Sequence, residues 1–496
     1  GDQQQQLIDP TKLAVGELIC EMAFFSFFWS RKEQIQPILA IRMVDIALKH
    51  GISGFSSFAF TLYAILLASS SSPSSPNHSN DIKAALRFCN LGLRMMDTSF
   101  PTLRPTVMLS TSFLSHWNEP LRQTLDPLLT AYGMGMETGN VEVALLCAGT
   151  YCSTYAMCGL PLQPVADDLR GYMQLIRDYA QENAYMVLQP LWQYLLNLMG
   201  EDNNNDNNIH RHLINKNHDH VPLGDPLYLN GEAMREDALR TRAMESQNGV
   251  ALRNIFEYRL RLAVMFGDYT MSELLLKELQ QSFHQEVKLD FGKAVEIFGA
   301  GITYFALARR KRGRRRRFYL RKARNYLQRL KEWIRLGNVN CHDLYLLLLA
   351  EDKSFSFSST SSNIRKRRNT NDFTLEEGKK TYDEAIASAS RSGFVHRAAQ
   401  ANELAAAYCV RGGDWNWAET YLRQAHQLYM RWGAVAKVKQ METIHDCLNC
   451  NRRRYGSDDD DTSGALDFPQ QISGSFQGRK RFTRKAADRH EKLVFA

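Results

Sequence analysis

Apolar side chains recur every three or four residues along most of this 496-residue chain, and this spacing constrains the fold more than any other feature. The run Val141, Ala144, Leu145, Ala148 and Cys152 is one example. Such a period places the apolar residues on one face of an α-helix. Strand-like alternation does not compete with it, and proline is scarce at 14 residues, which leaves long segments free for helices. The sequence therefore predicts an all-α fold.

Short turns separate the predicted helices. Glycine in left-handed backbone ends a helix, and Asn or Asp accepts hydrogen bonds from the first turn of the next one. Connections this short join antiparallel neighbours, so stacked helix pairs are expected. The predicted turns are Gly139-Asn140, Gly159-Leu160-Pro161, Gly267-Asp268 and Gly412-Gly413-Asp414.

The clearest repeat lies near the C-terminus. Residues 404–425 approximate a tetratricopeptide unit of about 34 residues, a weaker copy precedes it at 382–393, and a third helix is expected from Ala434. Together these patterns predict a TPR-like antiparallel helix-pair solenoid. The structural residues of the repeat, which we expect to pack between its helices, are Tyr408, Leu422, Ala425 and Trp432.

Three polar segments and a charged tail lack the apolar residues that a packed element needs, so we expect disordered insertions and a disordered tail. The first insertion is Ser-rich and covers residues 69–80. The predicted organisation is an N-terminal helical repeat region at 7–200, an Asn- and His-rich linker at 201–248, a middle helical region with a basic segment at 249–352, a Ser-rich linker at 353–371, C-terminal TPR-like helices at 372–450 and the tail at 451–496.

The net charge of +8 is local, because residues 309–324 hold 11 basic residues and no acidic one. Two interpretations stay open for this segment. Clustered arginines bind phosphates, and they also occur in nuclear-import signals, so Arg314, Arg315, Arg316 and Arg317 are candidates for weak polyanion binding. Alternatively, the segment is a solvated helix end and turn.

An uncharged apolar stretch at residues 52–68 is shorter than the about 20 residues that a membrane span requires. A buried helix explains it, and no membrane role is predicted. The nine cysteines are irregularly spaced and favour a reducing compartment. We therefore expect a cytoplasmic protein, with a nuclear location as the alternative.

The sequence contains no complete nucleotide-binding or kinase motif. A phosphate-binding loop with Gly, Lys and Ser/Thr at the required spacing is missing. The tripeptide Asp290-Phe291-Gly292 resembles a kinase magnesium motif but has no His-Arg-Asp loop before it, so Asp290 is predicted to cap a helix that runs to Arg309. The chain is predicted to be non-enzymatic and to need no cofactor.

Two clusters of potential metal ligands are also judged unsuitable. The first, in an Asn-rich loop without a rigid scaffold, is His210, His212, His218 and His220. The second, Cys447 and Cys450, has no partner pair at zinc-binding spacing. No metal site is predicted. His116-Trp117 is interpreted as a packed turn before a helix.

With these residues considered, the chain resembles the helical region that follows the ATPase module in predicted AAA/STAND-type signalling proteins. In those proteins the ATPase is fused to serine/threonine kinase, GAF, sensor histidine kinase or nucleotide cyclase domains. The blocks that carry the likeness are SHWNEPLRQTLDPLLTAYGMGMETGNVEVA at 115–144, LQPLWQYLLNLMG at 188–200, IFEYRLRLAVMFGDY at 255–269 and ANELAAAYCVRGGDWNWAETYLRQAHQLYMRWGAVAKV at 401–438.

The resemblance implies a regulatory or sensor scaffold that couples an ATPase module to a signalling output domain, with protein partners or adjacent domains of the same polypeptide. The missing initiator Met fits a piece of such a protein. The polar insertions depart from the family pattern, and no catalytic residue is carried over. A free-standing TPR adaptor, possibly nuclear, is the alternative. Asn402 and Glu403, polar in the middle of a predicted helix, are candidate interaction residues; an interhelical hydrogen bond for Asn402 and simple exposure for Glu403 are the alternatives.

Overall fold

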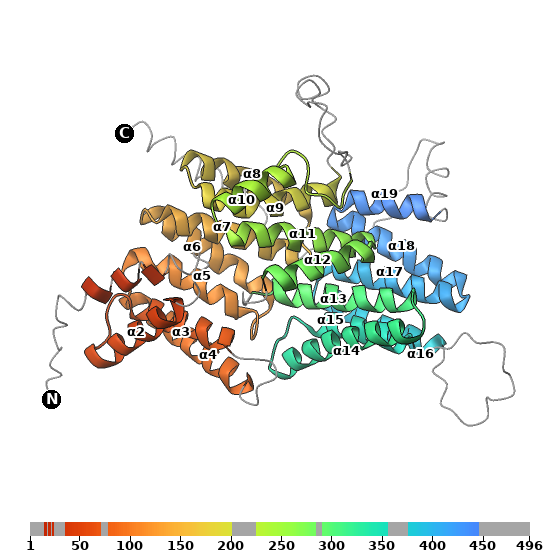
Figure 1. Cartoon of the computed structure of the whole chain (residues 1–496), viewed down its shortest axis with the longest axis horizontal. Helices are drawn as coiled ribbons and strands as arrows, with labels where there is room; N and C mark the ends of the chain where they lie inside the picture. The colour runs from red at the N-terminus through yellow and green to blue at the C-terminus, as the bar shows by residue number, and fades with distance from the viewer. Residues whose placement is uncertain are drawn as a thin grey trace, which may run out of the picture.

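Every regular element in the computed structural model is a helix, which confirms the all-α prediction for the described residues (Figure 1). Those residues are 14–16, 18–20, 22–23, 35–70, 78–200, 225–283, 290–355 and 375–445. Helices that follow one another in sequence pack side by side, as α3 does on α4, α6 on α7, α13 on α14 and α17 on α18. The chain is therefore a solenoid of antiparallel helix pairs.

The first half of the solenoid runs from the red to the yellow helices of Figure 1. Its α-helices are α2 (Ile35–His50), α3 (Ser56–Ser70), α4 (His78–Arg94), α5 (Arg104–Ser115), α6 (Leu125–Glu137), α7 (Val141–Met157), α8 (Leu162–Asp178) and α9 (Glu182–Met199). The second half comprises α10 (Glu236–Glu245), α11 (Gly249–Phe266), α12 (Tyr269–Ser282), α13 (Gly292–Arg309), α14 (Gly313–Arg335), α15 (His342–Lys353), α16 (Leu375–Arg391), α17 (Val395–Gly412), α18 (Trp415–Trp432) and α19 (Val435–Ile444).

The predicted caps are confirmed at three helix starts. Asn140, Asp268 and Asp414 each accept backbone N–H hydrogen bonds from the first turn of α7, α12 and α18. The predicted cap at Asp290 is wrong, although α13 ends at Arg309 as expected. Phe291 precedes α13 with helical backbone angles and a side chain buried in the core, so the helix starts one residue later without a side-chain cap.

The predicted linkers are longer than the structure supports. The first was placed at 69–80, but α3 extends to Ser70 and α4 begins at His78. The second was placed at 201–248, yet α10 lies within it and Leu229 and Ala233 are buried. The Asn-rich composition ends near residue 220, and apolar residues from 227 onward pack on the solenoid. The third is predicted at 353–371, but α15 extends to Lys353 and Phe355 packs against the core. Residues 71–77, 201–224 and 356–371 of the predicted insertions, and the predicted tail at 451–496, lie outside the described residues.

The apolar segment at 52–68 forms most of α3. Phe58, Ala59 and Leu62 are buried in a cluster with residues of α2 and with Val107 of α5, as expected for a buried helix. Among the described residues, no helix combines the length and the hydropathy that a membrane span requires.

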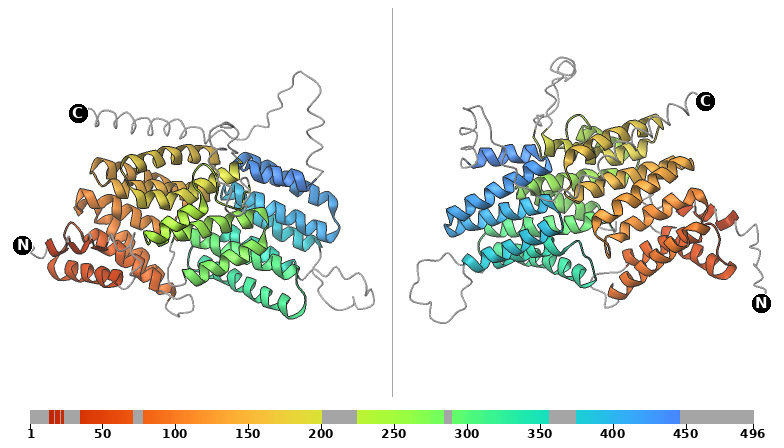
Figure 2. Two further views of the ribbon diagram at one scale, coloured as in Figure 1. Left: turned by 45° about the horizontal axis from the view of Figure 1, so that its top comes forward. Right: turned by 180° about the vertical axis from the view of Figure 1, so that it is seen from behind.

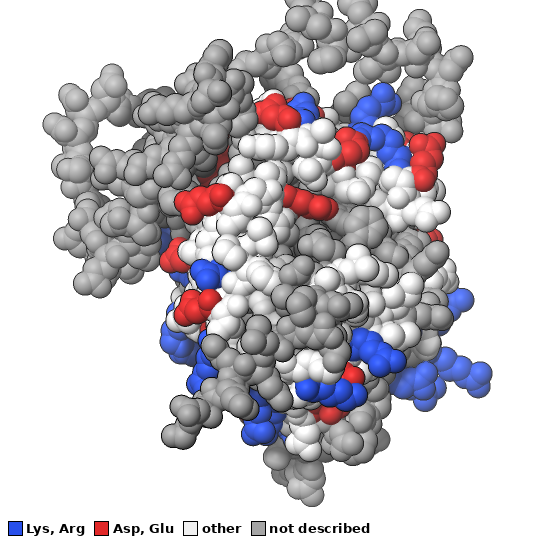
Figure 3. Space-filling view, turned by 90° about the vertical axis from the view of Figure 1, so that its left-hand side faces the viewer, with Lys and Arg blue, Asp and Glu red and all other residues white. Residues whose placement is uncertain are grey.

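The N-terminal end of the solenoid has apolar side chains on its surface. Ile38, Ile41 and Leu48 of α2 are exposed. Among the described residues, Figure 3 shows broad uncharged areas on this end of the molecule. Exposed apolar side chains gathered on one helix mark a candidate contact surface.

The C-terminal helices pack back onto the middle of the chain and not only onto their neighbours in sequence (Figures 1 and 2). Helix α19 contacts α9 and α11. The Gln440 side-chain amide donates a hydrogen bond to the Phe266 carbonyl at 2.9 Å, and Gly200 lies against Ala436. The part of the solenoid from α9 to α19 is closed on itself by these contacts, which join residues more than 170 positions apart.

A matched pair of glycine substitutions tests the helix packing. A Cβ at Gly135 of α6 would lie 2.8 Å from Ala144 Cβ and 3.1 Å from the Asn140 carbonyl oxygen, so Gly135→Ala must push α6 and α7 apart. We expect a loss of about 1–3 kcal/mol in the free energy of unfolding. Gly171→Ala on α8 meets open space and should instead stabilise by about 0.5–1 kcal/mol. Urea unfolding measures both, and equal effects would contradict this packing.

Candidate functional site

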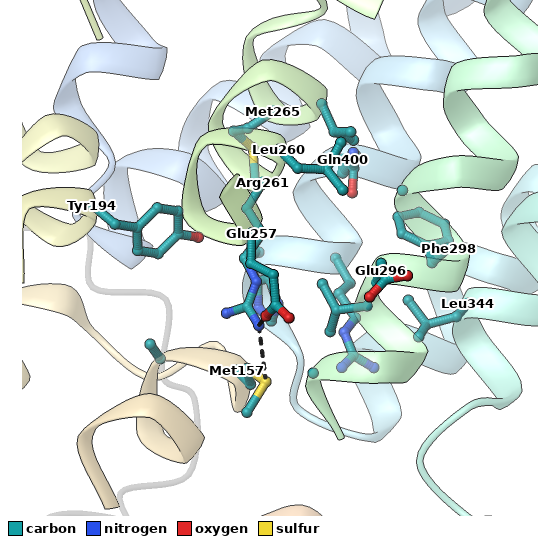
Figure 4. A pocket seen from close by; sticks show the side chains of 17 residues that line it. Met157, Tyr194, Glu257, Leu260, Arg261, Met265, Glu296, Phe298, Leu344 and Gln400 are labelled. Carbon is teal, nitrogen blue, oxygen red and sulfur yellow. Dashed lines mark hydrogen bonds and ion pairs between the residues drawn. The ribbon is translucent and has the colours of Figure 1, made fainter. Parts of the chain in front are cut away.

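A cavity of about 70 Å³ lies at the centre of the molecule, where α7, α9, α11, α13, α15 and α17 converge (Figure 4). Its wall has an apolar part and a polar part. The apolar part is formed by Ala156, Met157, Leu260, Val264, Met265, Val295, Phe298 and Leu344. The polar side chains are Tyr194, Glu257, Arg261, Glu296, His396, Arg397 and Gln400.

Helix α11 supplies three charged side chains from one face. Arg253, Glu257 and Arg261 are four residues apart, and residues at this spacing are neighbours on a helix surface. Arg253 Nε donates to Glu257 Oε1 at 2.7 Å, and Arg253 Nη2 donates to Glu296 Oε2 at 3.2 Å. Lys293 Nζ donates to Glu296 Oε1 at 2.6 Å. The two carboxylates of the cavity are thus already compensated by Arg253 and Lys293.

Arg261 has weaker contacts. Its Nη2 lies 3.9 Å from Glu257 Oε2 and 3.9 Å from the Met157 sulfur, the contact drawn as a dashed line in Figure 4. Its guanidinium also lies over the ring of Tyr258 at 4.8 Å. Both polar contacts are long, and a thioether is a weak acceptor. The guanidinium therefore retains hydrogen-bonding capacity at the cavity wall.

Arg397 lies on α17 and its side chain is only 4% exposed. Nη1 donates to the Asn340 carbonyl at 3.2 Å and to the Asp343 carboxylate at 3.1 and 3.2 Å. The guanidinium also stacks 3.9 Å from the Phe394 ring centre. Nη2, in contrast, has no hydrogen-bond partner among the described residues.

His396 lines the cavity next to Arg397. Its ring stacks on Trp432 with the ring centres 5.1 Å apart, and its Nδ1 has no hydrogen-bond partner within the described parts of the chain. Burial holds the pKa of His396 well below its ordinary value, and the positive charges of Arg397, Arg261 and Arg122 lower it further. The imidazole is therefore uncharged at neutral pH, and the cavity surroundings are unfavourable for another cation.

Two turns distant in sequence hold this region together. The Leu121 N–H donates to Asn340 Oδ1 at 2.9 Å, and Asn340 Nδ2 donates to the carbonyls of His116 and Glu119, both at 2.8 Å. His116 and Trp117 are buried, so the predicted packed turn is confirmed. Since Asn340 also presents its carbonyl to Arg397, the turn at 116–121 is linked to the cavity wall.

The predicted interaction residues on α17 have structural roles instead. Asn402 is 1% exposed, and Nδ2 donates to the Ala398 carbonyl of the same helix at 2.8 Å. Its assignment to a partner surface is therefore wrong, and the observed bond is not interhelical. Glu403 accepts hydrogen bonds from the Tyr429 hydroxyl at 3.0 Å and Lys437 Nζ at 2.7 Å. It joins α17, α18 and α19 and is not simply exposed.

The predicted repeat residues are placed as expected. Tyr408, Leu422, Ala425 and Trp432 are all buried between α16, α17, α18 and the neighbouring helices. The Tyr408 ring packs 5.3 Å from that of Tyr382 on α16, which supports the weaker preceding repeat.

The basic segment divides into a buried end and an exposed run. Arg309 pairs with the buried Glu351 and stacks on Phe355, so it serves the fold. The exposed run lies at the start of α14 and consists of Arg314, Arg315, Arg316 and Arg317. Within it, Arg316 lies over the Phe355 ring. Cations are unfavourable at a helix N-terminus because the helix dipole is positive there. The run therefore confers no evident benefit on α14.

This exposed run gives a direct prediction. Replacing Arg314–Arg317 with Ser should reduce retention on heparin or DNA and make it less dependent on salt, because fewer phosphates or sulfates are neutralised. The unfolding free energy should stay nearly constant. The measurement is the salt concentration at which each protein elutes. Unchanged elution would show that the run is only a solvated surface.

Other predicted or potential ligand clusters give no site. Residues 210–220 and the Cys447/Cys450 pair lie outside the described residues. Within the described ranges, no group of three or more His, Cys, Asp and Glu is arranged to hold a metal ion. Cysteines there are buried, and burial raises the pKa of Cys158 to about 12.

Comparison with known proteins does not assign the site. The sequence matches no family model and no curated protein. A solved structure described as "Circular tandem repeat protein with novel repeat topology and enhanced subunit contact surfaces" shares 12% identity, with a TM-score of 0.19, covering 90% of this chain and 98% of that one. At that TM-score the similarity supports no conclusion about function.

Most of the cavity residues were missed in the sequence. The available signal was Arg253, Glu257 and Arg261, three charged residues at four-residue spacing in a helix whose other residues are mostly apolar. Such a pattern is costly unless the charges are paired. His396 and Arg397 carry no comparable signal, because they stand near a helix start where polar residues are common.

Proposed function

We propose that this chain is a non-catalytic sensor scaffold that couples an ATPase module to a signalling output domain in a larger polypeptide. The observation that carries the proposal is the closure of the solenoid around a charged cavity. The middle helix α11 and the C-terminal helix α17 meet at this cavity. The turn at 116–121 is linked to its wall through Asn340, which binds both Leu121 and Arg397. A change in the cavity would alter contacts of both the N-terminal and the C-terminal halves.

Two further features support a role between other modules. The α2 face at the N-terminal end of the solenoid is apolar and exposed, which suits contact with an adjacent domain. In addition, the sequence blocks that resemble the STAND-associated helical region include polar residues of the cavity wall, namely Tyr194, Glu257 and Arg261.

The isolated chain should neither bind nor hydrolyse ATP. Triphosphate binding normally uses a glycine-rich loop and magnesium ligands, and the cavity is small for a nucleotide, since ligand pockets for drug-sized molecules are about 300–1,000 Å³. Equilibrium dialysis with labelled ATP at moderate salt should show no saturable site. A single saturable site of micromolar affinity would contradict the prediction that the chain does not bind ATP.

Sequencing the complete transcript tests the coupling role. The proposal expects a Walker motif encoded upstream of Gly1 and an output domain downstream of the helical region. An in-frame stop codon immediately upstream would contradict it and favour the free-standing adaptor, for which the exposed arginines of α14 are the supporting observation.

A further inference from the structure

We propose that the central cavity binds a small molecule with an oxyanion head and a short apolar tail, with the head held by Arg261 and Arg397. This inference names a ligand class for the proposed sensor and rests on that function for its biological meaning. The binding itself is a property of this chain and is tested on it alone.

The hydrogen-bond pairing of the charged side chains favours an anion. Glu257 and Glu296 bind Arg253 and Lys293, and Asp343 binds only one nitrogen arm of Arg397. Nη2 of Arg397 has no hydrogen-bond partner in the described parts of the chain, and Nη2 of Arg261 makes only two long polar contacts, both at 3.9 Å. Leaving a buried donor unsatisfied is costly, and a bound oxyanion would satisfy it.

Guanidinium groups suit this role because their planar donors match carboxylate and phosphate oxygens. Both groups belong to the wall of the same cavity and come from different helices, α11 and α17. The ring of His396 lies beside them and is uncharged, so it can supply either a donor or an acceptor. A ligand head placed between the two arginines would tie α11 to α17.

The cavity also limits the ligand's size and shape. Its 70 Å³ leaves room for on the order of five water-sized groups, which fits a short carboxylate and excludes a nucleotide. The rest of the wall is apolar, with Met157, Val264, Phe298 and Leu344 among its side chains. A short alkyl chain would be buried there, so we favour a short-chain carboxylate over inorganic phosphate.

Isothermal titration calorimetry on the intact chain, in a low-chloride Tris buffer, tests the proposal with acetate, butyrate, inorganic phosphate and butyramide. We expect saturable binding of acetate and tighter binding of butyrate, because of its buried chain. Inorganic phosphate has an oxyanion head but no apolar chain, so we expect it to bind more weakly than butyrate. Butyramide has nearly the same shape without the charge and should not bind measurably.

Variants locate the site. Arg261→Met keeps the apolar stem, leaves Glu257 bonded to Arg253, and should weaken butyrate binding by about tenfold or more. Arg397→Lys keeps a cation beside Asp343 but removes the second donor arm of the guanidinium. This variant should also weaken butyrate binding. Arg170→Met, on the exposed surface of α8, is the control and should bind like the wild type. Circular dichroism confirms that each variant is folded.

Several results would overturn the proposal: no binding of any oxyanion at millimolar concentration, equal binding of butyramide, or unchanged affinity in folded Arg261→Met. Failure of the proposed function is separate. If the transcript encodes no ATPase but butyrate binds through Arg261, the ligand site is supported and the coupling role is contradicted.

Discussion

Replacing Trp432 with alanine should lower the free energy of unfolding by about 3–5 kcal/mol, the usual cost of truncating a buried aromatic side chain. Trp432 is 1% exposed, closes the end of α18 and stacks on His396 of α17. The next residue, Gly433, has a left-handed φ of 95° and lies against Leu162 of α8. The substitution thus leaves a cavity where three helices meet.

Urea unfolding followed by circular dichroism gives this change in stability. Trp415→Ala is the matched control, because Trp415 begins the same helix with 67% of its surface exposed. We expect the control to change stability by no more than about 0.5 kcal/mol. Equal losses for the two variants would show that Trp432 is not a packing residue of the C-terminal junction.

Replacing Arg397 with methionine should cost about 3–5 kcal/mol, because it leaves the carboxylate of Asp343 buried without its cation. Both side chains are 4% exposed and their charged groups lie 3.1 Å apart. The Arg397 Nη1 bond to the Asn340 carbonyl is lost as well, which loosens the link to the turn at 116–121.

A double-mutant cycle separates the pair from its surroundings. Arg397→Met combined with Asp343→Leu should be less destabilising than the sum of the two single changes, since no buried charge is left over. Lys49→Met is the control, because Lys49 pairs with Asp45 on the exposed surface of α2 and should lose less than about 1 kcal/mol. Additive single and double changes would contradict a coupled buried pair.

Local sequence patterns predicted the helices and many of their ends. Asn140, Asp268 and Asp414 cap their helices through hydrogen bonds to residues at most three positions away, so a short window of sequence contains the information. The same holds for Trp432, whose position before Gly433 marks a helix end. Asp290 failed because burial of the adjacent Phe291, a tertiary effect, decided where α13 begins.

Local sequence patterns could not predict the candidate site. Hydrophobic periodicity shows which face of a helix is buried but not which distant helix covers it. The bond between Leu121 and Asn340 joins residues 219 positions apart, and the contact of Gln440 with Phe266 spans 174. Asn402 shows the same limit: its polarity in mid-helix left a partner surface and an interhelical hydrogen bond open, whereas the structure buries it and bonds it within α17.

Hydrogen exchange on truncated chains tests most directly whether the solenoid is closed. We compare a chain ending at residue 445, which retains α19, with one ending at 433, which lacks it. Loss of α19 should speed amide exchange at residues 196–200, at the end of α9, and around Phe266 of α11, because these segments contact α19. Unchanged protection there, with faster exchange only in α17 and α18, would contradict closure and indicate an open, linear solenoid.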